Sequence, residues 1–536
     1  MARIQRLPLE VSQKIAAGEV VERPFSVVKE LVENSLDAGA SDVRVELLAG
    51  GKRLIRVQDD GAGMSREDAE LCFERHSTSK LRTEDDLERI STLGFRGEAL
   101  ASISAVSEII LETSEGREGK GCRIERKGGE IVAVTEIAFP RGTTIEVRDI
   151  FYNLPARRKF LRSDQSELGH IVRYLSSVAL AYPEVRFSLL HGRREIMNCP
   201  RVGSPRERLF QLYGKDVLDR LLEVNYQAGQ QSVFGLSSRP PKGRPDRTHQ
   251  LFFVNRRPVR DRVLQASLNQ AYRGFLEKDH FPEAFIFLTL PYEEVDVNVH
   301  PTKAEVRFRE SQLVFHLLLR SLETALAKER GVKEIYPRAE EAGAFAGVME
   351  KAEFGSTGRP RLDREGEEGL LVIDQHNAHE RVLFDKYKEI DAQKKWPRAT
   401  PLIPVLLDLS PAQVVSLEKN QVLLEEAGFR AEAMGGRTYS LSGFPDIFEA
   451  EEARGVLLQL LDEIGEEQAD QKGDKMLATL ACRTAVKAHE PLAKEKMEFL
   501  VDELFRTSNP GVCPHGRPII VKIGKAEIEK GLKRNP

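Results

Sequence analysis

Residues 26–39 read S-V-V-K-E-L-V-E-N-S-L-D-A-G, and this stretch decides the fold of the first part of the chain. Ser26 can cap the start of a helix here, and Gly39 can cap its end. Glu30 and Asn34 are four residues apart and share one helix face, a pair that suits a carboxylate polarising water beside an amide oxygen binding Mg²⁺. On an ordinary helix the same pair is simply solvated. The apolar stripe of the predicted helix is Val27, Val28, Leu31, Val32 and Leu36.

The sequence next predicts a strand that ends in acidic and glycine residues. Residues 54–58 alternate like a strand, and D-D-G-A-G-M follows at 59–64. Asp-Asp-Gly after a strand first of all indicates a turn. Gly61 and Gly63 would also let the backbone approach a flat ligand closely, so that Asp59 could accept a hydrogen bond from the exocyclic amine of adenine.

Two later segments have the features of a phosphate site. R-H-S-T-S-K occupies residues 75–80, and G-F-R-G-E-A-L occupies residues 94–100. The second segment is a glycine-rich turn leading into a helix, an arrangement that presents backbone N–H groups to phosphate. Because the chain has no G-x-x-x-x-G-K-[ST], a Walker-type site is excluded.

Composition narrows the class of protein. The 536 residues predict about three or four domains, at roughly 100–200 residues each. Lys and Arg total 80 against 84 Asp and Glu, which excludes binding of nucleic acid by bulk charge but allows a local basic patch. The five cysteines are too scattered for a disulfide framework, and neither a signal peptide nor a membrane span is recognisable. We therefore expect a multidomain protein of a reducing compartment with no membrane partner.

Composition also shifts along the chain. Residues 332–368 are rich in Gly, Ala and charge and lack aliphatic periodicity, which predicts a flexible linker. A second boundary is expected at Gly214, where a helical segment gives way to strand-like segments. The expected domains are 1–213, 214–331 and 369–536, on either side of that boundary and the linker.

The C-terminal domain holds candidate metal ligands. Residues 370–385 read L-L-V-I-D-Q-H-N-A-H-E-R-V-L-F-D, which predicts a strand running into a helix, and C-P-H-G-R-P follows at 513–518. Singly, such cysteines and histidines are ordinary buried residues. Together they form a plausible ligand set for Zn²⁺ or Mn²⁺. The candidate residues are Asp374, His376, Glu380, Cys482, Cys513 and His515.

Residues 30–39, 59–63, 94–100 and 142–145 together resemble the motif set of the GHKL ATPases. Three segments narrow the resemblance further: R-H-S-T-S-K at 75–80, F-Y-N-L-P-A-R-R-K-F-L at 151–161 and D-V-N-V-H-P-T-K-A-E-V-R-F at 296–308. Their sequences resemble those of the MutL family of DNA mismatch repair proteins. This resemblance implies an α/β and α+β multidomain protein. Its parts would be a GHKL α/β sandwich ATPase domain, a ribosomal-protein-like split β-α-β transducer domain, the linker and an α+β C-terminal dimerisation domain.

The resemblance also implies roles for single residues. Glu30 would be the general base for the water that attacks the γ-phosphate, and Asn34 would bind Mg²⁺. Asp59 with Thr144 would read adenine, and Lys303 would reach the γ-phosphate of ATP from the transducer domain. The other residues expected to shape the pocket, or to hold phosphates in a lid, are Gly61, Gly63, Thr78, Ser79, Lys80, Gly94, Phe95, Arg96 and Gly97.

The C-terminal segment resembles the nuclease half of MutL, whose signature is D-Q-H-A-x-x-E-x-x-x-x-E. Here Asn377 replaces the alanine and Asp385 replaces the final glutamate. The resemblance implies a two-metal endonuclease with Asp374 and Glu380 as catalytic residues. The competing hypothesis is an ATP-driven matchmaker without nuclease activity, in which the Cys and His residues hold structural zinc only.

The expected division of ligands places Glu380 and His515 on one ion. His376 and Cys513 would hold the second ion, with Asp374 and Cys482 close by. The extra imidazole of His379 points about 100° away from Glu380 on a helix, so we do not expect it to bind a metal.

Local basic clusters are the candidate DNA contacts, although most such clusters are only solvated. Few aromatic residues are interleaved with them, so we expect sequence-independent contact with the backbone of double-stranded DNA, weakened by salt. Residues 253–260, F-V-N-R-R-P-V-R, resemble the family segment near the DNA-binding groove. The candidate DNA-binding residues are Arg157, Arg158, Arg256, Arg257, Arg260 and Arg262.

The remaining expectations follow from the family resemblance. They are a bacterial, cytoplasmic, nucleoid-associated homodimer that uses ATP and Mg²⁺ and is recruited by a mismatch-recognition protein. The family also carries a sliding-clamp motif, Q-x-x-[LI]-x-P. Ala399 replaces its glutamine, Leu402 and Pro404 match, and the alternative is an edge strand flanked by prolines.

Overall fold

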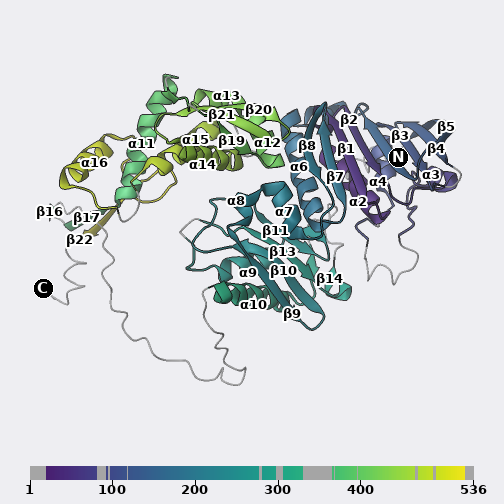
Figure 1. The fold of residues 1–536 in the computed structure, drawn as a ribbon, viewed down its shortest axis with the longest axis horizontal. Coiled ribbons are helices and arrows are strands. Elements are labelled where there is room, and N and C mark those ends of the chain that lie inside the picture. Colours follow the sequence, from purple (N-terminus) through teal and green to yellow (C-terminus); the bar gives the residue numbers. More distant parts are fainter. Residues whose placement is uncertain are drawn as a thin grey trace, which may run out of the picture. The chain divides into compact units, whose positions relative to one another are not determined.

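The computed structural model describes residues 20–80, 92–94, 97–116, 119–276, 280–296, 306–329, 365–366, 369–394, 396–401, 403–464, 469–486 and 490–524. The expected site residues Phe95, Arg96 and Lys303, and Leu402 of the clamp motif, lie outside these ranges. The chain divides into two compact units, one of residues 1–334 with 408–419 and the other of residues 335–407 with 420–536 (Figure 1). The boundary expected at Gly214 lies within the first unit, between its two large sheets.

The first of these sheets has eight strands in the order β5-β4-β3-β6-β2-β1-β7-β8. Strand β1 pairs antiparallel with β2 and parallel with β7, and alternate residues of β1 and β2 are buried. The strands are β1 (Asp42–Leu48), β2 (Leu54–Asp59), β3 (Glu108–Ser114), β4 (Lys120–Lys127), β5 (Glu130–Ala138), β6 (Gly142–Arg148), β7 (Arg186–His191) and β8 (Arg194–Cys199).

Helix α2 (Pro24–Asp37) is the helix expected from residues 26–39. It begins earlier than expected, because Pro24 is suited to the first turn and Arg23 takes the N-cap place that we assigned to Ser26. Gly39 ends the helix with φ +71°, and its N–H donates to the carbonyl of Leu36 at 3.0 Å. Helices α2 and α6 pack on each other and on β2 and β7. The other helices here are η1 (Ala49–Gly51), α3 (Arg66–Leu71), α4 (Ala99–Ala105), α5 (Pro155–Lys159), α6 (Asp164–Ala181) and α7 (Pro205–Tyr213).

The second sheet has the strand order β12-β11-β13-β10-β9, with α9 and α10 packed together beside it (Figure 1). Strands β11 and β13 are parallel and α9 lies between them in the chain, which is the expected β-α-β connection. The elements are α8 (Lys215–Leu218), β9 (Leu221–Ala228), β10 (Gln231–Ser238), β11 (Gln250–Val254), β12 (Arg257–Val259), α9 (Arg262–Ala271), β13 (Ala284–Thr289), η3 (Tyr292–Glu294), β14 (Val295–Asp296), β15 (Arg307–Phe308) and α10 (Ser311–Glu329).

The C-terminal unit contains two small sheets, β16-β17-β22 and β18-β21-β19, with β20 paired to β21. A core around Ile373, Leu504 and Cys513 joins β17, α11 and α16. The strands are β16 (Glu365–Gly366), β17 (Gly369–Ile373), β18 (Arg398–Ala399), β19 (Val405–Asp408), β20 (Arg430–Gly435), β21 (Thr438–Pro445) and β22 (Ile520–Gly524). The helices are α11 (Gln375–Ala392), α13 (Gln421–Glu426), α14 (Ala450–Glu463), α15 (Ala469–Thr484) and α16 (Lys494–Arg506), while α12 (Pro411–Lys419) belongs to the stretch grouped with the first unit. Within the described ranges, no helix combines the length and apolarity needed to span a membrane.

Candidate nucleotide and metal sites

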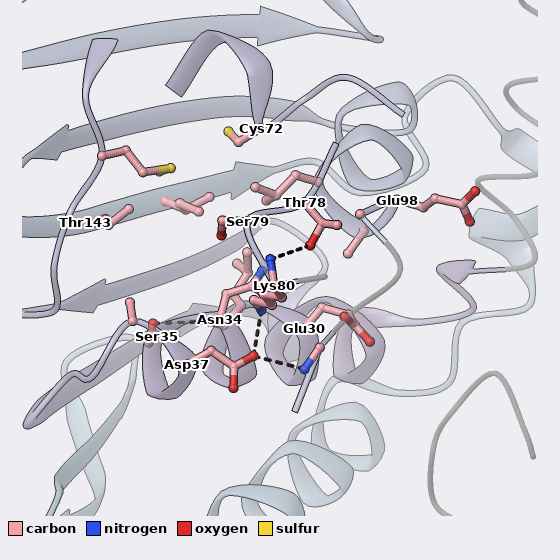
Figure 2. A pocket seen from close by; sticks show the side chains of 18 of the residues that line it. Glu30, Asn34, Ser35, Asp37, Cys72, Thr78, Ser79, Lys80, Glu98 and Thr143 are labelled. Atoms are coloured by element: carbon pink, nitrogen blue, oxygen red, sulfur yellow. Dashed lines mark hydrogen bonds and ion pairs between the residues drawn. The ribbon is translucent and has the colours of Figure 1, made fainter. Parts of the chain in front are cut away.

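A cavity of about 970 Å³ opens beside α2 in the first unit. Figure 2 shows Glu30, Asn34 and Asp37 on α2, with Lys80 reaching toward them from the segment after α3. The expected residues that line this cavity are Glu30, Asn34, Asp59, Gly63, Thr78, Ser79, Lys80, Gly94 and Gly97. The cavity therefore gathers residues that are widely separated in the sequence, and its volume is within the usual range of small-molecule sites.

Asp59 lies at the end of β2 and is fixed by two donors. Its Oδ2 accepts a hydrogen bond from the Ser35 hydroxyl at 2.8 Å, and its Oδ1 accepts one from the Gly61 amide at 2.9 Å. Burial raises the pKa of Asp59, and these two hydrogen bonds oppose that rise. A side chain at position 61 would contact Ala38 at about 3.0 Å, which explains the glycine.

The adenine role expected for Thr144 needs correction. Thr143 and Ile145 line the cavity, while Thr144 does not. Successive residues of a strand face opposite sides, and the register pairs Asp59 with Thr143 and Gln58 with Thr144. Thr143 is therefore the threonine that faces the ligand space beside Asp59.

The side of the cavity around Lys80 is organised by a carboxylate, Asp37, that the sequence analysis missed. Asp37 Oδ2 lies 2.6 Å from the ammonium of Lys80 and accepts the Gly94 amide at 3.0 Å. Asp37 Oδ1 accepts the Leu93 amide at 2.8 Å, and Lys80 also donates to Asn34 Oδ1 at 2.8 Å. The oxygens of Asn34 and Asp37 thus already hold a cation between them, which fits the proposed use of Asn34 as an Mg²⁺ ligand.

Two overlapping groups of potential metal ligands meet on Glu380 in the C-terminal unit. They are His376–Glu380–Cys482 and Glu380–Cys513–His515, and within each group the candidate ligand atoms lie within 4.8 Å of one another. Glu380 is fully buried, with its Oε1 3.1 Å from His376 Nε2 and its Oε2 3.4 Å from His515 Nδ1. The thiols and imidazoles suit Zn²⁺, while the shared carboxylate is the ligand type that Mn²⁺ prefers. The expected pairing of His376 with Cys513 is wrong, because α15 places Cys482 beside His376 instead.

The two histidines of α11, His376 and His379, are both oriented by hydrogen bonds to the backbone of Val486. His376 Nδ1 lies 2.9 Å from the carbonyl of Val486, which turns Nε2 toward Glu380. His379 accepts the Val486 amide at 3.0 Å and belongs to neither group of potential ligands among the described residues. Hydrogen bonds with Cys482 and then Glu380 raise the pKa of His376 to about 11, so metal binding there would have to displace a proton.

Asp374 is the N-cap of α11, and Asp385 lies in the middle of the same helix. Asp374 caps the helix, with its Oδ1 accepting the Asn377 amide at 3.0 Å, and its side chain is exposed. Asp385 accepts the Ser508 amide at 2.6 Å and pairs with Arg381 at 3.3 Å. Asp385, which replaces the family glutamate, thus ties α11 to the segment after α16.

The expected DNA residues separate into two kinds. Arg257 is only 6% exposed and donates to the carbonyl of Thr92 at 2.9 Å, so its assignment to a DNA-binding surface is wrong. Arg256 pairs with Glu184 and lies over the Tyr182 ring, which ties it to the first sheet domain. Of the other four candidate arginines, Arg158, Arg260 and Arg262 are exposed. Arg157 is half-buried and donates a hydrogen bond to the carbonyl of Val21.

The segment compared with the clamp motif contains a short edge strand. Residues Arg398–Ala399 form β18 and pair with Phe444 and Pro445 at the edge of their sheet. The edge-strand alternative is therefore confirmed for these two residues.

The domain that holds this cavity, built on the eight-stranded mixed sheet, belongs to a known class of ATPase. The family described as Histidine kinase-, DNA gyrase B-, and HSP90-like ATPase matches residues 22–133. A solved structure described as the N terminal domain of a DNA repair protein is 26% identical with a TM-score of 0.52, and the match covers 59% of this chain and 98% of that chain. The GHKL ATPase fold expected from the sequence is thereby confirmed.

Two further families match the rest of the chain. The family described as DNA mismatch repair protein, C-terminal domain, matches residues 209–327, and the MutL C terminal dimerisation domain matches residues 364–492. DNA mismatch repair protein MutL of Koribacter versatilis is 36% identical over 100% of both chains, and that of Trichlorobacter lovleyi is 37% identical over 99% of both. This chain belongs to the MutL family of DNA mismatch repair proteins, with an ATPase domain and a C-terminal dimerisation domain.

Proposed function

We propose that the chain acts as a homodimeric, ATP-dependent clamp that links mismatch recognition to removal of a DNA strand. The observation that carries the proposal is the single cavity in which Glu30 and Asn34 on α2 meet Asp59 and Lys80. Asp59 would accept the amine of adenine, Lys80 would hold phosphate, and Glu30 would take a proton from the attacking water. A bound Mg²⁺ would supply charge stabilisation at the phosphates, with Asn34 as its protein ligand.

The second domain would sense the γ-phosphate. Lys303 would reach it from the domain built on β9–β13, so that ATP and ADP favour different arrangements of the two N-terminal domains. Slow hydrolysis would then time the closing of the dimer around DNA.

Replacing the general base tests the ATPase part. Glu30→Ala should leave binding of a fluorescent ATP analogue within a few-fold of wild type and lower the hydrolysis rate at least about 100-fold, the usual contribution of a positioned base. Glu33→Gln is the matched control, because Glu33 is on the same helix but pairs with Lys29 at 2.8 Å instead of lining the cavity. Equal loss in both variants, or undiminished hydrolysis in Glu30→Ala, would refute the assignment.

We further propose that the C-terminal groups of ligands support metal-dependent nicking of DNA. Glu380 belongs to both groups, and Asp374 stands at the exposed start of α11, where it could contact a phosphodiester or its attacking water. Bound Zn²⁺ or Mn²⁺ would supply Lewis-acid stabilisation of the phosphate oxygens. His376, Cys482, Cys513 and His515 would orient the ions around the shared carboxylate.

Nicking of supercoiled plasmid with Mn²⁺ distinguishes this proposal from a matchmaker that holds structural zinc. Asp374→Asn should abolish nicking while metal content and ATP hydrolysis persist, because asparagine preserves the cap of α11. Cys513→Ser, in contrast, should lower both the nicking activity and the metal content. Bound zinc without nicking by the wild-type chain would favour the matchmaker, and retained nicking by Asp374→Asn would rule out its catalytic role.

The exposed arginines at the start of α9 are the proposed contacts for double-stranded DNA. The double change Arg260→Glu and Arg262→Glu should weaken binding of any duplex at low salt by roughly tenfold or more and reduce the salt dependence of the affinity. Arg193→Glu, in the exposed turn between β7 and β8, reverses a charge elsewhere and should have a smaller effect. Equal affinity of the double variant and wild type would exclude this surface.

The remaining parts of the proposal follow the family. A mismatch-recognition protein would recruit the dimer in the bacterial nucleoid, and a sliding clamp would be a further partner. The match to the dimerisation domain supports the homodimer, and membership of the family supports recruitment by a mismatch-recognition protein.

A further inference from the structure

Arg257 connects the second sheet to the phosphate side of the nucleotide cavity. It begins β12, where it pairs with Val254 of β11, and the residue is only 6% exposed. Its Nη2 donates to the carbonyl of Thr92 at 2.9 Å. Within the described ranges, its Nη1 has no hydrogen-bond partner. Burying a guanidinium that is hydrogen-bonded to only one backbone carbonyl costs folding free energy. A role for Arg257 in positioning residues of the cavity would explain why it is buried there.

The residues it holds are the ones that organise the phosphate side. Thr92 and Gly94 both line the cavity, and the Thr92 hydroxyl donates to the Gly94 carbonyl at 2.8 Å. The Leu93 and Gly94 amides donate to Asp37, whose carboxylate also holds Lys80. A continuous series of contacts therefore runs from Arg257 through residues 92–94 and Asp37 to Lys80.

We propose that Arg257 is a positioning residue of the second domain that sets the Thr92–Gly94 turn, and through Asp37 the phosphate-binding Lys80. The inference rests on the proposed binding of ATP in this cavity and adds a route by which the second domain controls it. Arg260 and Arg262 follow Arg257 by three and five residues. DNA held by these arginines would act on the same short segment, so DNA and nucleotide affinities would be coupled.

Arg256 is a natural control for this role. Like Arg257, it reaches from the second sheet domain to the first, because its Nε donates to the carbonyl of Ala181 at 3.2 Å and its guanidinium pairs with Glu184. Among the residues that the structure describes, it forms no hydrogen bond or ion pair with residues 92–94 or Asp37. Replacing Arg256 therefore weakens contact between the two sheet domains without removing the support of the turn.

Hydrogen–deuterium exchange of the nucleotide-free full chain tests the structural part. In Arg257→Met, the Leu93 and Gly94 amides should exchange roughly tenfold faster or more, because a charged donor to the turn is lost. Asp37→Asn should accelerate the same amides, Arg256→Met should leave them within about twofold, and Arg257→Lys should partly restore protection. Unchanged exchange in Arg257→Met overturns the proposal, and so does equal acceleration in Arg256→Met. Unaltered exchange in β11 and β13 verifies that the variants are folded.

Affinity for a fluorescent ADP analogue, measured with and without a saturating duplex, tests the coupling. Duplex should change the affinity of wild type at least about threefold, while Arg257→Met should bind duplex normally but show less than half of that change. The proposed control by the second domain is contradicted if duplex changes the ADP-analogue affinity of Arg257→Met as much as that of wild type. It is also contradicted if duplex does not change the affinity of wild type. Failure of wild type to bind the analogue at all would instead overturn the proposed nucleotide site, which the exchange measurement does not depend on.

Discussion

Ser35 and Asp37 lie two residues apart on α2 and fix the two ends of the cavity. Ser35 holds the carboxylate of Asp59, while Asp37 gathers Lys80 with the amides of Leu93 and Gly94. Each carboxylate is held by several donors, which limits the positions it can take. One helix therefore sets the separation between the proposed adenine and phosphate contacts.

Gly63 offers a test at the same scale. Its φ is +70°, and a Cβ there would lie 1.9 Å from the carbonyl oxygen of Ser114. Gly63→Ala should therefore lower the free energy of unfolding by about 3 kcal/mol or more and weaken nucleotide binding, because backbone must move. Gly119→Ala is the control: φ is +67° but nothing lies within 4 Å, so the cost should be about 1 kcal/mol. If urea unfolding gave similar losses of unfolding free energy for Gly63→Ala and Gly119→Ala, the predicted clash with Ser114 would make no contribution to stability.

At the scale of elements, a buried charge network joins the ends of strands in the second sheet domain. Glu283 immediately precedes β13 and is 3% exposed. It lies 2.7 Å from His249, just before β11, and 3.3 Å from Arg220, just before β9. Burial raises the pKa of Glu283, but His249, Arg220 and Arg244 outweigh it and lower the pKa below the ordinary value of 4.5.

The sign of this shift predicts how stability depends on pH. A carboxylate with a lowered pKa stabilises the folded domain above its unfolded pKa, and that contribution is lost as the pH falls through the folded pKa. Glu283→Gln should cost about 3 kcal/mol near pH 7, because it leaves buried cations uncompensated. The difference from wild type should shrink as the pH falls below 4.5. A difference in unfolding free energy that stays constant down to pH 3 would contradict this account.

Elements also show where sequence patterns succeed. The apolar stripe of residues 26–39 predicted α2 and the shared face of Glu30 and Asn34, because helical periodicity is local. The family resemblance pointed to Thr144 instead of Thr143, because the face that Thr143 presents depends on the pairing of β6 with β2. It also assigned Arg257 to DNA, because a cluster of charges does not reveal which of its members is buried.

At the scale of the whole molecule, the chain contains two compact units with different expected ligands. The nucleotide cavity lies in the first, and the groups around Glu380 lie in the second. A ligand stabilises only the cooperative unit that binds it, by about 2.7 kcal/mol at one hundred times its Kd.

Calorimetry of the intact chain should therefore show two separable transitions. ADP with Mg²⁺ should raise the Tm of one, and Zn²⁺ should raise the Tm of the other, while a zinc-selective chelator that leaves Mg²⁺ in solution reverses the second shift only. Cys482→Ser should abolish the zinc shift and leave the ADP shift unchanged. If zinc and ADP moved the same transition, the two sites would not belong to independent units.

The sequence by itself determined the ATPase class, the family and the main helix beside the cavity, and it named the His, Cys and Glu residues that gather in the C-terminal unit, because short motifs and local periodicity carry that information. Only the tertiary structure decided that Asp37 collects the phosphate-side donors, that Cys482 rather than Cys513 lies beside His376, and that Arg257 is buried against Thr92. Those contacts join residues many positions apart, so they depend on strand register and helix packing that no local pattern encodes.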